Sequence, residues 1–182
     1  MIPTKQILGI KFFNGDVEEA VAFVHRHGGY LVAPSGTCFA RLREDEPYRR
    51  AVLLADLAIA GSGLMVVLWR LLRRENVTRI SGLKYLKQLL TKLERERSVR
   101  VFWILPGERS RQKLLECFRS ALPVKTEDCY VAPRYGLEIE DRDLVALLEH
   151  RRAAHIVIAI GSGPQEKLGH YLCENLSYLQ AR

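Results

Sequence analysis

The chain has 182 residues and carries 28 Lys and Arg side chains against 21 Asp and Glu, which gives a formal charge of +7. Hydrophobic residues make up 48% and charged residues 27%. That composition is ordinary for a globular protein and excludes disordered, collagen-like and low-complexity classes. The length is sufficient for a substantial core, and we expect a single domain over residues 1–182.

The positive charge is concentrated in one stretch of the sequence. Residues 70–100 contain ten basic and three acidic side chains, which leaves 18 of each sign in the rest of the chain. A basic region of this kind favours phosphate-bearing partners, namely nucleic acid, anionic lipid or a phosphorylated ligand. The alternative is a pair of solvated helical faces.

Several classes of protein are excluded by the residues that are missing. The four cysteines form no CxxC pair, which argues against a zinc site, and we predict neither a metal nor another cofactor. The first nine residues are too short and too polar for a signal peptide, which favours a cytoplasmic setting. Residues 51–72 have the length of a membrane span, but Gly61-Ser62-Gly63 interrupts them. We therefore expect a buried strand followed by a buried helix there.

Apolar runs and amphipathic runs alternate along the chain. In chain order, the expected elements are strand Ile7–Phe12, helix Val17–His27, strand Tyr30–Ala33, helix Pro47–Leu54, strand Leu57–Ala60, helix Leu64–Arg74, helix Gly82–Arg97, strand Val101–Leu105, helix Arg109–Leu122, strand Cys129–Ala132, helix Glu140–Arg152, strand His155–Ile160 and helix Pro164–Leu179. Most of the strands lack polar alternation, which is typical of strands buried on both faces. Asp16 and Glu19 form the capping-box pattern of a helix start.

This order of elements predicts an α/β fold, a Rossmann-like parallel-sheet sandwich with helices on both faces. Ligands of such folds bind where the carboxyl ends of strands meet helix N-termini. Three expected strand ends carry small or polar residues, at Ala33–Thr37, Gly61–Gly63 and Gly161–Lys167. Their backbone N–H groups suit phosphate or carboxylate, although Gly-Ser-Gly is also common turn chemistry. There is no P-loop motif and no GxGxxG after the first strand.

A set of short motifs occurs in a characteristic order along nearly the whole chain. They are Ile7-Leu8-Gly9-Ile10, Asp16-Val17-Glu18-Glu19-Ala20, Pro47-Tyr48-Arg49, Ala55-Asp56-Leu57, Arg79-Ile80-Ser81-Gly82, Arg100-Val101-Phe102, Leu105-Pro106-Gly107 and Gly161-Ser162-Gly163-Pro164-Gln165-Glu166-Lys167. With these motifs the chain resembles the WecG/TagA/CpsF glycosyltransferases. The last motif is the most specific, since it is similar to the family's GxGxPxQEK signature in a shortened form.

The resemblance implies transfer of a sugar from a nucleotide-diphosphate donor such as UDP-N-acetylmannosamine. The acceptor would be a polyprenyl-diphosphate-linked sugar in bacterial envelope or exopolysaccharide synthesis. It also suggests that the chain can self-associate, and it places the chain in the cytoplasm or at the inner face of the membrane. We expect no nucleic-acid partner, because the basic stretch lacks the motifs of such proteins. The family carries an Arg-rich C-terminal appendage that helps it reach the membrane, and the sequence ends at Arg182 before any such segment.

The same resemblance selects the residues expected to bind substrate. They are Ser35, Gly61, Ser62, Arg79, Gly82, Gly107, Tyr135, Gly161, Gly163, Gln165 and Glu166. Arg79 is the leading cation for the diphosphate, with a solvated loop arginine as the alternative. Glu166 is expected at the donor, with ordinary capping of the last helix as the alternative.

The expected catalytic groups are missing. The family is thought to use a Thr at the end of the second strand and an Asp, the candidate general base, at the end of the third. This sequence has Ala33 and Gly61 there, and Ser35 where the family has Asn. Alanine and glycine cannot take a proton, so the catalytic residues stay unassigned and enzymatic activity is left open. Asp141-Arg142-Asp143 is the only DxD sequence, and we interpret it as a helix start rather than a metal site.

Three functions therefore remain from the sequence. The first is a nucleotide-sugar glycosyltransferase with a changed base. The second is a catalytically impaired family member that binds nucleotide sugar or a partner enzyme. The third is nucleic-acid binding, which rests on the charge alone and lacks a helix-turn-helix, a zinc motif or aromatic residues among the basic ones.

Overall fold

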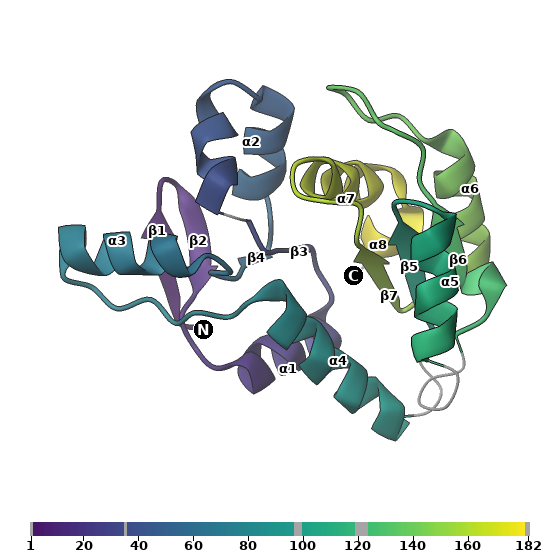
Figure 1. The fold of residues 1–182 in the computed structure, drawn as a ribbon, viewed down its shortest axis with the longest axis horizontal. Helices are drawn as coiled ribbons and strands as arrows, with labels where there is room; N and C mark the ends of the chain where they lie inside the picture. Colours follow the sequence, from purple (N-terminus) through teal and green to yellow (C-terminus); the bar gives the residue numbers. More distant parts are fainter. Residues whose placement is uncertain (1, 35, 97–99, 119–123, 181–182) are drawn as a thin grey trace. The chain divides into compact units, whose positions relative to one another are not determined.

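The structure is a computed structural model that describes residues 2–34, 36–96, 100–118 and 124–180. The chain divides into two compact units, one that runs to Leu89 and one that starts at Leu90. Each unit contains its own sheet (Figure 1).

The first unit contains a four-stranded sheet in the order β1-β2-β4-β3. Its elements are β1 (Thr4–Ile7), β2 (Ile10–Phe13), α1 (Val17–His27), β3 (Leu31–Val32), the 3-10 helix η1 (Gly36–Arg43), α2 (Glu46–Leu53), β4 (Leu57–Ala58), α3 (Gly63–Arg73) and α4 (Gly82–Glu96), which contains the boundary between the units. Strand β4 pairs in parallel with both β2 and β3. Strands β1 and β2 pair antiparallel.

The hairpin at the start of the chain corrects the expectation of one strand over Ile7–Phe12. Leu8 and Gly9 form a turn between β1 and β2, with φ angles of 52° and 85°. Positive φ at both central residues is the signature of a two-residue hairpin turn. The turn was missed because Leu8 continues an apolar run in the sequence, whereas its side chain is exposed in the structure.

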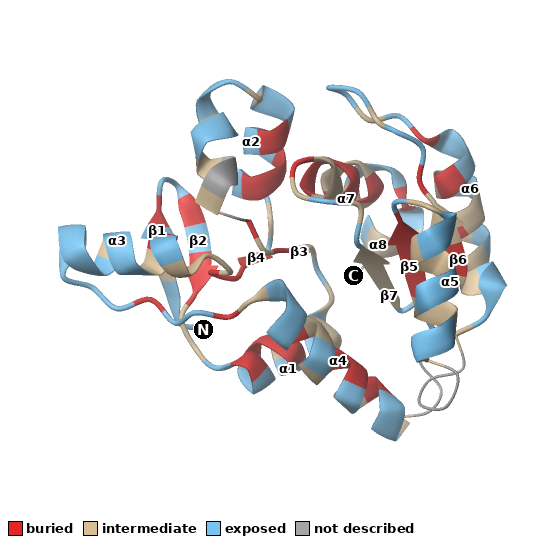
Figure 2. Ribbon diagram, in the orientation of Figure 1, coloured by how far each residue is buried: buried red, intermediate tan, exposed pale blue. Residues whose placement is uncertain are grey.

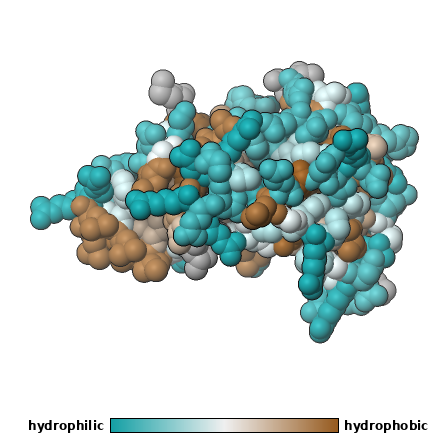
Figure 3. All heavy atoms as spheres, turned by 90° about the horizontal axis from the view of Figure 1, so that it is seen from above, coloured by the Kyte–Doolittle hydropathy of each residue, from teal (hydrophilic) through white to brown (hydrophobic). Residues whose placement is uncertain are grey.

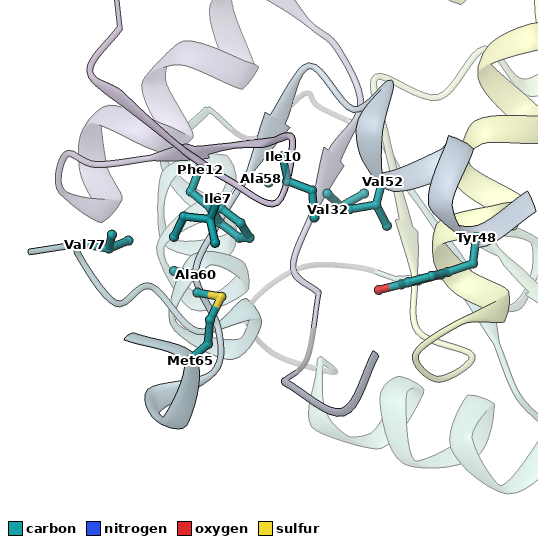
Figure 4. Packing of buried hydrophobic residues seen from close by; sticks show 10 residues of the cluster. All are labelled: Ile7, Ile10, Phe12, Val32, Tyr48, Val52, Ala58, Ala60, Met65 and Val77. Atoms are coloured by element: carbon teal, nitrogen blue, oxygen red, sulfur yellow. The ribbon is translucent and has the colours of Figure 1, made fainter. Parts of the chain in front are cut away.

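Strand β4 of the first unit is buried on both faces, as predicted, whereas β1 and β2 contain exposed residues. Successive β4 residues point to opposite faces of a sheet, and Leu57, Ala58, Ile59 and Ala60 are all almost fully buried. On one face, Phe12 and Ala58 pack with Val52 of α2 and Met65 of α3 (Figures 2 and 4). The carboxyl end of β4 is therefore held firmly between helices.

Helix α3 departs from the expectation of a buried helix. Met65 is its one buried residue, whereas its other leucines and Val67 are largely exposed. Across the described parts of the chain, no helix combines the length and the apolar character needed to cross a membrane.

The second unit contains a three-stranded parallel sheet in the order β6-β5-β7. Its elements are β5 (Val101–Leu105), α5 (Glu108–Cys117), η2 (Thr126–Asp128), β6 (Cys129–Val131), α6 (Arg142–Arg151), β7 (His155–Ile158), α7 (Pro164–Asn175) and α8 (Ser177–Gln180). Phe102 and Ile104 of β5 pack with the leucines of α6 and α7. Trp103, on the opposite face, lies 5.6 Å from the Phe118 ring at the end of α5. Helical segments thus cover both faces of β5, and the α/β, Rossmann-like prediction is confirmed.

The remaining differences concern short helices and the ends of elements: β3, β4, β6 and β7 are each one or two residues shorter than expected. The single helix expected over Pro164–Leu179 is two helices, because Leu176 adopts extended backbone between α7 and α8. The helix expected over Arg109–Leu122 ends at Cys117, and residues 119–122 lie outside the described residues, as does Arg97. Neither 3-10 helix, η1 nor η2, was expected from the sequence.

Candidate functional site

The carboxyl end of β4 carries a turn that several predicted site residues share. Ser62 is the N-cap of α3, and its Oγ accepts a hydrogen bond from the Met65 backbone N–H at 3.3 Å. Gly36 lies against the same hydroxyl, since a Cβ at this position would come within 2.6 Å of the Ser62 Oγ. Ser35, another predicted site residue, lies outside the described residues.

Arg79 lies beside this turn, as its predicted role requires. Residues Ala60 and Arg79 form an isolated parallel bridge, in which the Ile80 N–H donates to the Ala60 carbonyl at 3.1 Å. The Arg79 Nε donates to the Gly61 carbonyl at 3.4 Å. A Cβ at Gly63 would lie 3.5 Å from the guanidinium carbon. A permanent positive charge is therefore held at the N-terminus of α3.

The same turn contains the positions where the family is thought to carry its catalytic groups. A Cβ at Gly61 would have the carbonyl oxygens of Ala33 and Pro34 as its nearest neighbours, at 3.9 and 4.0 Å. A Cβ at Gly82, the first residue of α4, would lie 3.5 Å from the Ala33 Cβ. Strand ends and a loop that are distant in sequence thus meet here. The groups at these described positions are backbone and methyl, and none is a carboxylate.

The second unit brings another set of predicted residues to one sheet edge. Gly107 follows β5 and precedes α5, while Gly161 and Gly163 follow β7 and precede α7. Because β5 and β7 are parallel neighbours, their carboxyl ends lie at the same edge. Gly161 and Gly163 have φ angles of 99° and 97°, which side chains with a Cβ rarely adopt. The glycine pattern therefore reflects backbone conformation at this edge.

Glu166 forms the cap of α7. Its side chain is 2% exposed, and Oε2 accepts from the Gly163 N–H at 2.6 Å. Its Oε1 accepts from the Gln165 Nε2 at 3.2 Å and from the Ser162 Oγ at 3.5 Å. The contacts of Glu166 therefore correspond to the alternative role, which is capping of the last helix. The Gln165 amide is turned toward this carboxylate.

Lys167 was not among the predicted site residues, yet it connects α7 to the loop that follows β6. Only 8% of the residue is exposed, and its Nζ donates to the Leu137 carbonyl at 2.8 Å. The loop that Lys167 holds includes Tyr135, which was predicted to bind substrate. Lys167 is the last residue of the Gln165-Glu166-Lys167 motif, but nothing in the sequence indicates its backbone partner.

Tyr135 and Tyr130 both donate to one buried carboxylate. Their hydroxyls reach the Asp141 Oδ2 at 2.5 and 2.9 Å, while Asp141 Oδ1 accepts from the Leu144 N–H at 3.0 Å. Asp141 is thus the N-cap of α6, in agreement with the interpretation of the DxD sequence as a helix start. The Tyr135 hydroxyl proton is engaged by Asp141, so contact with a ligand would use its ring or oxygen lone pair.

These tyrosines predict a pH-dependent loss of stability at the alkaline end. Burial, and then the Asp141 hydrogen bond and charge, raise the pKa of Tyr130 from an ordinary 10 to about 12 and raise the pKa of Tyr135 further. A raised folded-state pKa contributes stability that is complete below pH 10 and is lost as the pH rises through 12. We expect absorbance at 295 nm to show late-ionising tyrosines in the folded protein.

The Tyr130→Phe variant isolates this effect. This variant should lose the ionisation near pH 12. Its free energy of unfolding should fall less steeply as the pH rises above 10. Tyr171→Phe, on α7 of the same unit, serves as the control. The assignment is contradicted if the ionisation that Tyr130→Phe loses lies near pH 10 and not near pH 12.

Within the described residues, no cluster of three or more His, Cys, Asp or Glu side chains is placed to hold a metal ion. What the described residues offer instead is backbone donors at glycine turns, at the carboxyl ends of parallel strands, with a guanidinium beside one turn. That combination is typical of α/β proteins that bind anionic ligands at their strand ends. Comparison with known proteins makes the assignment specific.

The chain belongs to the family described as the glycosyl transferase WecG/TagA/CpsF family, whose match covers residues 5–181. The match confirms the resemblance inferred from the motifs, and it includes both units. Membership supports a glycosyltransferase role in cell-envelope polysaccharide synthesis, with a nucleotide-sugar donor and a lipid-linked acceptor in general. No curated protein matches the chain closely enough to add a relative.

Proposed function

We propose that this chain transfers a sugar from a UDP-N-acetylmannosamine-like donor to a polyprenyl-diphosphate-linked sugar. The observation that supports this most directly is Arg79 beside the Gly61–Gly63 turn at the start of α3. A guanidinium and a helix N-terminus both stabilise the negative charge that a nucleoside diphosphate develops as it leaves. The proposal treats residues 1–182 as one domain, because the family match spans both units.

The residues proposed to bind donor and acceptor belong to the two groups described above. In the first unit they are Ser35, Gly61, Ser62, Arg79 and Gly82; in the second they are Gly107, Tyr135, Gly161, Gly163, Gln165 and Glu166. Glu166 and Gly163 would act by shaping the turn before α7, since the carboxylate is already engaged by backbone. The proposal requires no metal ion or other cofactor, and it places the chain in the cytoplasm or at the inner face of the membrane.

A second candidate function is binding of nucleotide sugar without transfer. The observation that favours it is the pair Ala33 and Gly61, which lie together at the strand ends without a group that can accept a proton. Binding and transfer can be separated, because binding depends on Arg79 and the turns, whereas transfer also requires a base near the acceptor hydroxyl.

Titration calorimetry with uridine diphosphate tests the donor site. The Arg79→Ala variant should bind uridine diphosphate about tenfold more weakly or worse, because a charge-assisted hydrogen bond is worth roughly 1.5–3 kcal/mol. Arg26→Ala, which removes an exposed arginine at the end of α1, should leave the affinity unchanged.

The calorimetry has a clear contrary outcome. If the unaltered protein binds neither uridine diphosphate nor a UDP-sugar, the donor-site proposal fails for both candidate functions. If Arg79→Ala and Arg26→Ala weaken binding equally, the effect is one of net charge, and Arg79 is not a specific phosphate ligand.

A further inference from the structure

Apart from Arg70 and Arg73 in its last turn, helix α3 carries only apolar side chains. Its residues Gly63–Arg73 contain no acidic side chain and no uncharged polar one except the Trp69 indole N–H. Such apolar side chains are normally buried against another element. Here only Met65 is buried, and Val66 and Trp69 are half-buried.

The outer face of α3 is a continuous apolar stripe. Its members are exposed leucines and a valine spaced by three or four residues along the helix: Leu64, Val67, Leu68, Leu71 and Leu72. Leu71 and Leu72 are 72% and 77% exposed. The large brown patch in Figure 3 lies over this helix. Contiguous apolar surface of this kind marks a site of interaction.

Basic side chains accompany the stripe at the C-terminal end of the helix. Arg70, Arg73 and Arg74 are exposed, and Arg73 lies 5.7 Å from the centre of the Trp69 ring. The first acidic residue after them, Glu75, is paired with Lys5 at 3.0 Å. Arg73 thus lies toward the half-buried side of the helix, whereas Arg70 and the C-cap residue Arg74 put positive charge next to the stripe at this end.

We propose that the outer face of α3 docks on an anionic bilayer surface. Amphipathic segments with leucines on one side and arginines beside them lie at the headgroup boundary, where the leucines enter the acyl region. The long arginine side chains reach the lipid phosphates, and each basic residue adds to the attraction. With eleven residues, α3 is too short to span a bilayer, so the helix lies along the surface.

Charge complementarity favours the bilayer over a second copy of this chain. A second α3 would cover the leucines, but it carries arginines and no carboxylate, so the arginines would gain no counter-charge. An anionic bilayer supplies both apolar volume and negative charge. The inference does not rest on the proposed reaction, because it is drawn from this helix alone.

Vesicle sedimentation tests the proposal without donor or acceptor. The protein should bind vesicles of equal parts phosphatidylglycerol and phosphatidylcholine, more weakly at higher salt, and should bind pure phosphatidylcholine poorly. The double variant Leu71→Gln/Leu72→Gln should lower the partition coefficient about tenfold by removing apolar contact. Arg70→Gln should lower it about fivefold through loss of charge.

Leu53 and Leu54 provide a matched control. They are adjacent leucines at the C-terminal end of α2, with exposed fractions of 38% and 57%. Leu53→Gln/Leu54→Gln should bind the anionic vesicles as the unaltered protein does. The proposal is overturned if the unaltered protein does not bind anionic vesicles, or if the two double variants behave alike. It is also overturned if light scattering shows a dimer that only Leu71→Gln/Leu72→Gln dissociates, because the occupant is then a second copy. Uridine diphosphate binding is measured separately, so failure of this proposal leaves the donor-site result intact.

Discussion

Replacing Gly61 with Asp, together with Ala33→Thr, should raise the rate of sugar transfer by about a hundredfold or more. A positioned general base contributes roughly 10²–10⁴ to a rate, and the described strand ends at these two positions offer no proton acceptor. The added carboxylate would lie in the same turn as Arg79, which is held on the Gly61 carbonyl. Base and diphosphate-binding cation would then be within one site.

The structure has room for this substitution. The atoms nearest to a Cβ at position 61 are two carbonyl oxygens at 3.9 and 4.0 Å, which is ordinary van der Waals contact. Gly61 is not among the residues with positive φ, so an L side chain meets no backbone strain there. We therefore expect Gly61→Asp to fold.

The assay follows release of uridine diphosphate in the presence of a short-chain polyprenyl-diphosphate-linked N-acetylhexosamine. The matched control is Gly61→Asn with Ala33→Thr, because asparagine has the shape of aspartate but does not take up the proton. Equal rates for the Asp and Asn variants would contradict a base at position 61. If every variant binds uridine diphosphate and none transfers sugar, the second candidate function, binding without transfer, is favoured.

Glu166→Ala should destabilise the second unit by about 2–3 kcal/mol, since it leaves a buried N–H without its charged acceptor. The Glu166 carboxylate is 2% exposed and accepts from Gly163 at 2.6 Å. Glu166→Gln keeps an oxygen acceptor but removes the charge, so its effect should be intermediate. The same variants should weaken uridine diphosphate binding, if the turn before α7 contributes to the donor site.

The chain contains two tryptophans, Trp69 in α3 and Trp103 in β5, which places one in each unit. A Trp69→Phe background makes Trp103 the sole tryptophan reporter of the second unit during urea unfolding. Asp16→Ala serves as the comparison, because Asp16 caps α1 at an exposed site in the first unit. Asp16→Ala should lower the free energy of unfolding of the first unit by about 1 kcal/mol, a typical value for the loss of a helix cap. A Trp103 transition that is unchanged in Glu166→Ala would show that the cap contributes little.

Much of the fold could be predicted from local sequence patterns. Helix α1 begins and ends where the capping box and the periodicity indicate, and β5 has the predicted bounds. Local patterns did not predict the turn at Leu8, because this residue extends an apolar run in the sequence. They were also insufficient for α3, because periodicity does not reveal which face of an apolar helix finds a partner.

The candidate site was predictable as motifs but not as contacts. The sequence pointed to Arg79 and to the glycine turns through family resemblance. It did not indicate that the guanidinium binds the Gly61 carbonyl, or that Lys167 holds the Leu137 carbonyl. A hydrogen bond from a lysine to a backbone carbonyl cannot be predicted from the sequence, because every residue has a carbonyl.

The sequence by itself determined the alternation of strands and helices, the family, the location of the positive charge and the loss of the expected base. These properties depend on residue identity and on spacing within a few turns of chain. Only the tertiary structure decided that Ala33, Gly61 and Gly82 meet, that Asp141 holds two tyrosine hydroxyls, and that the leucines of α3 face solvent. Such facts depend on strand pairing and on packing between segments distant in sequence, which no local pattern encodes.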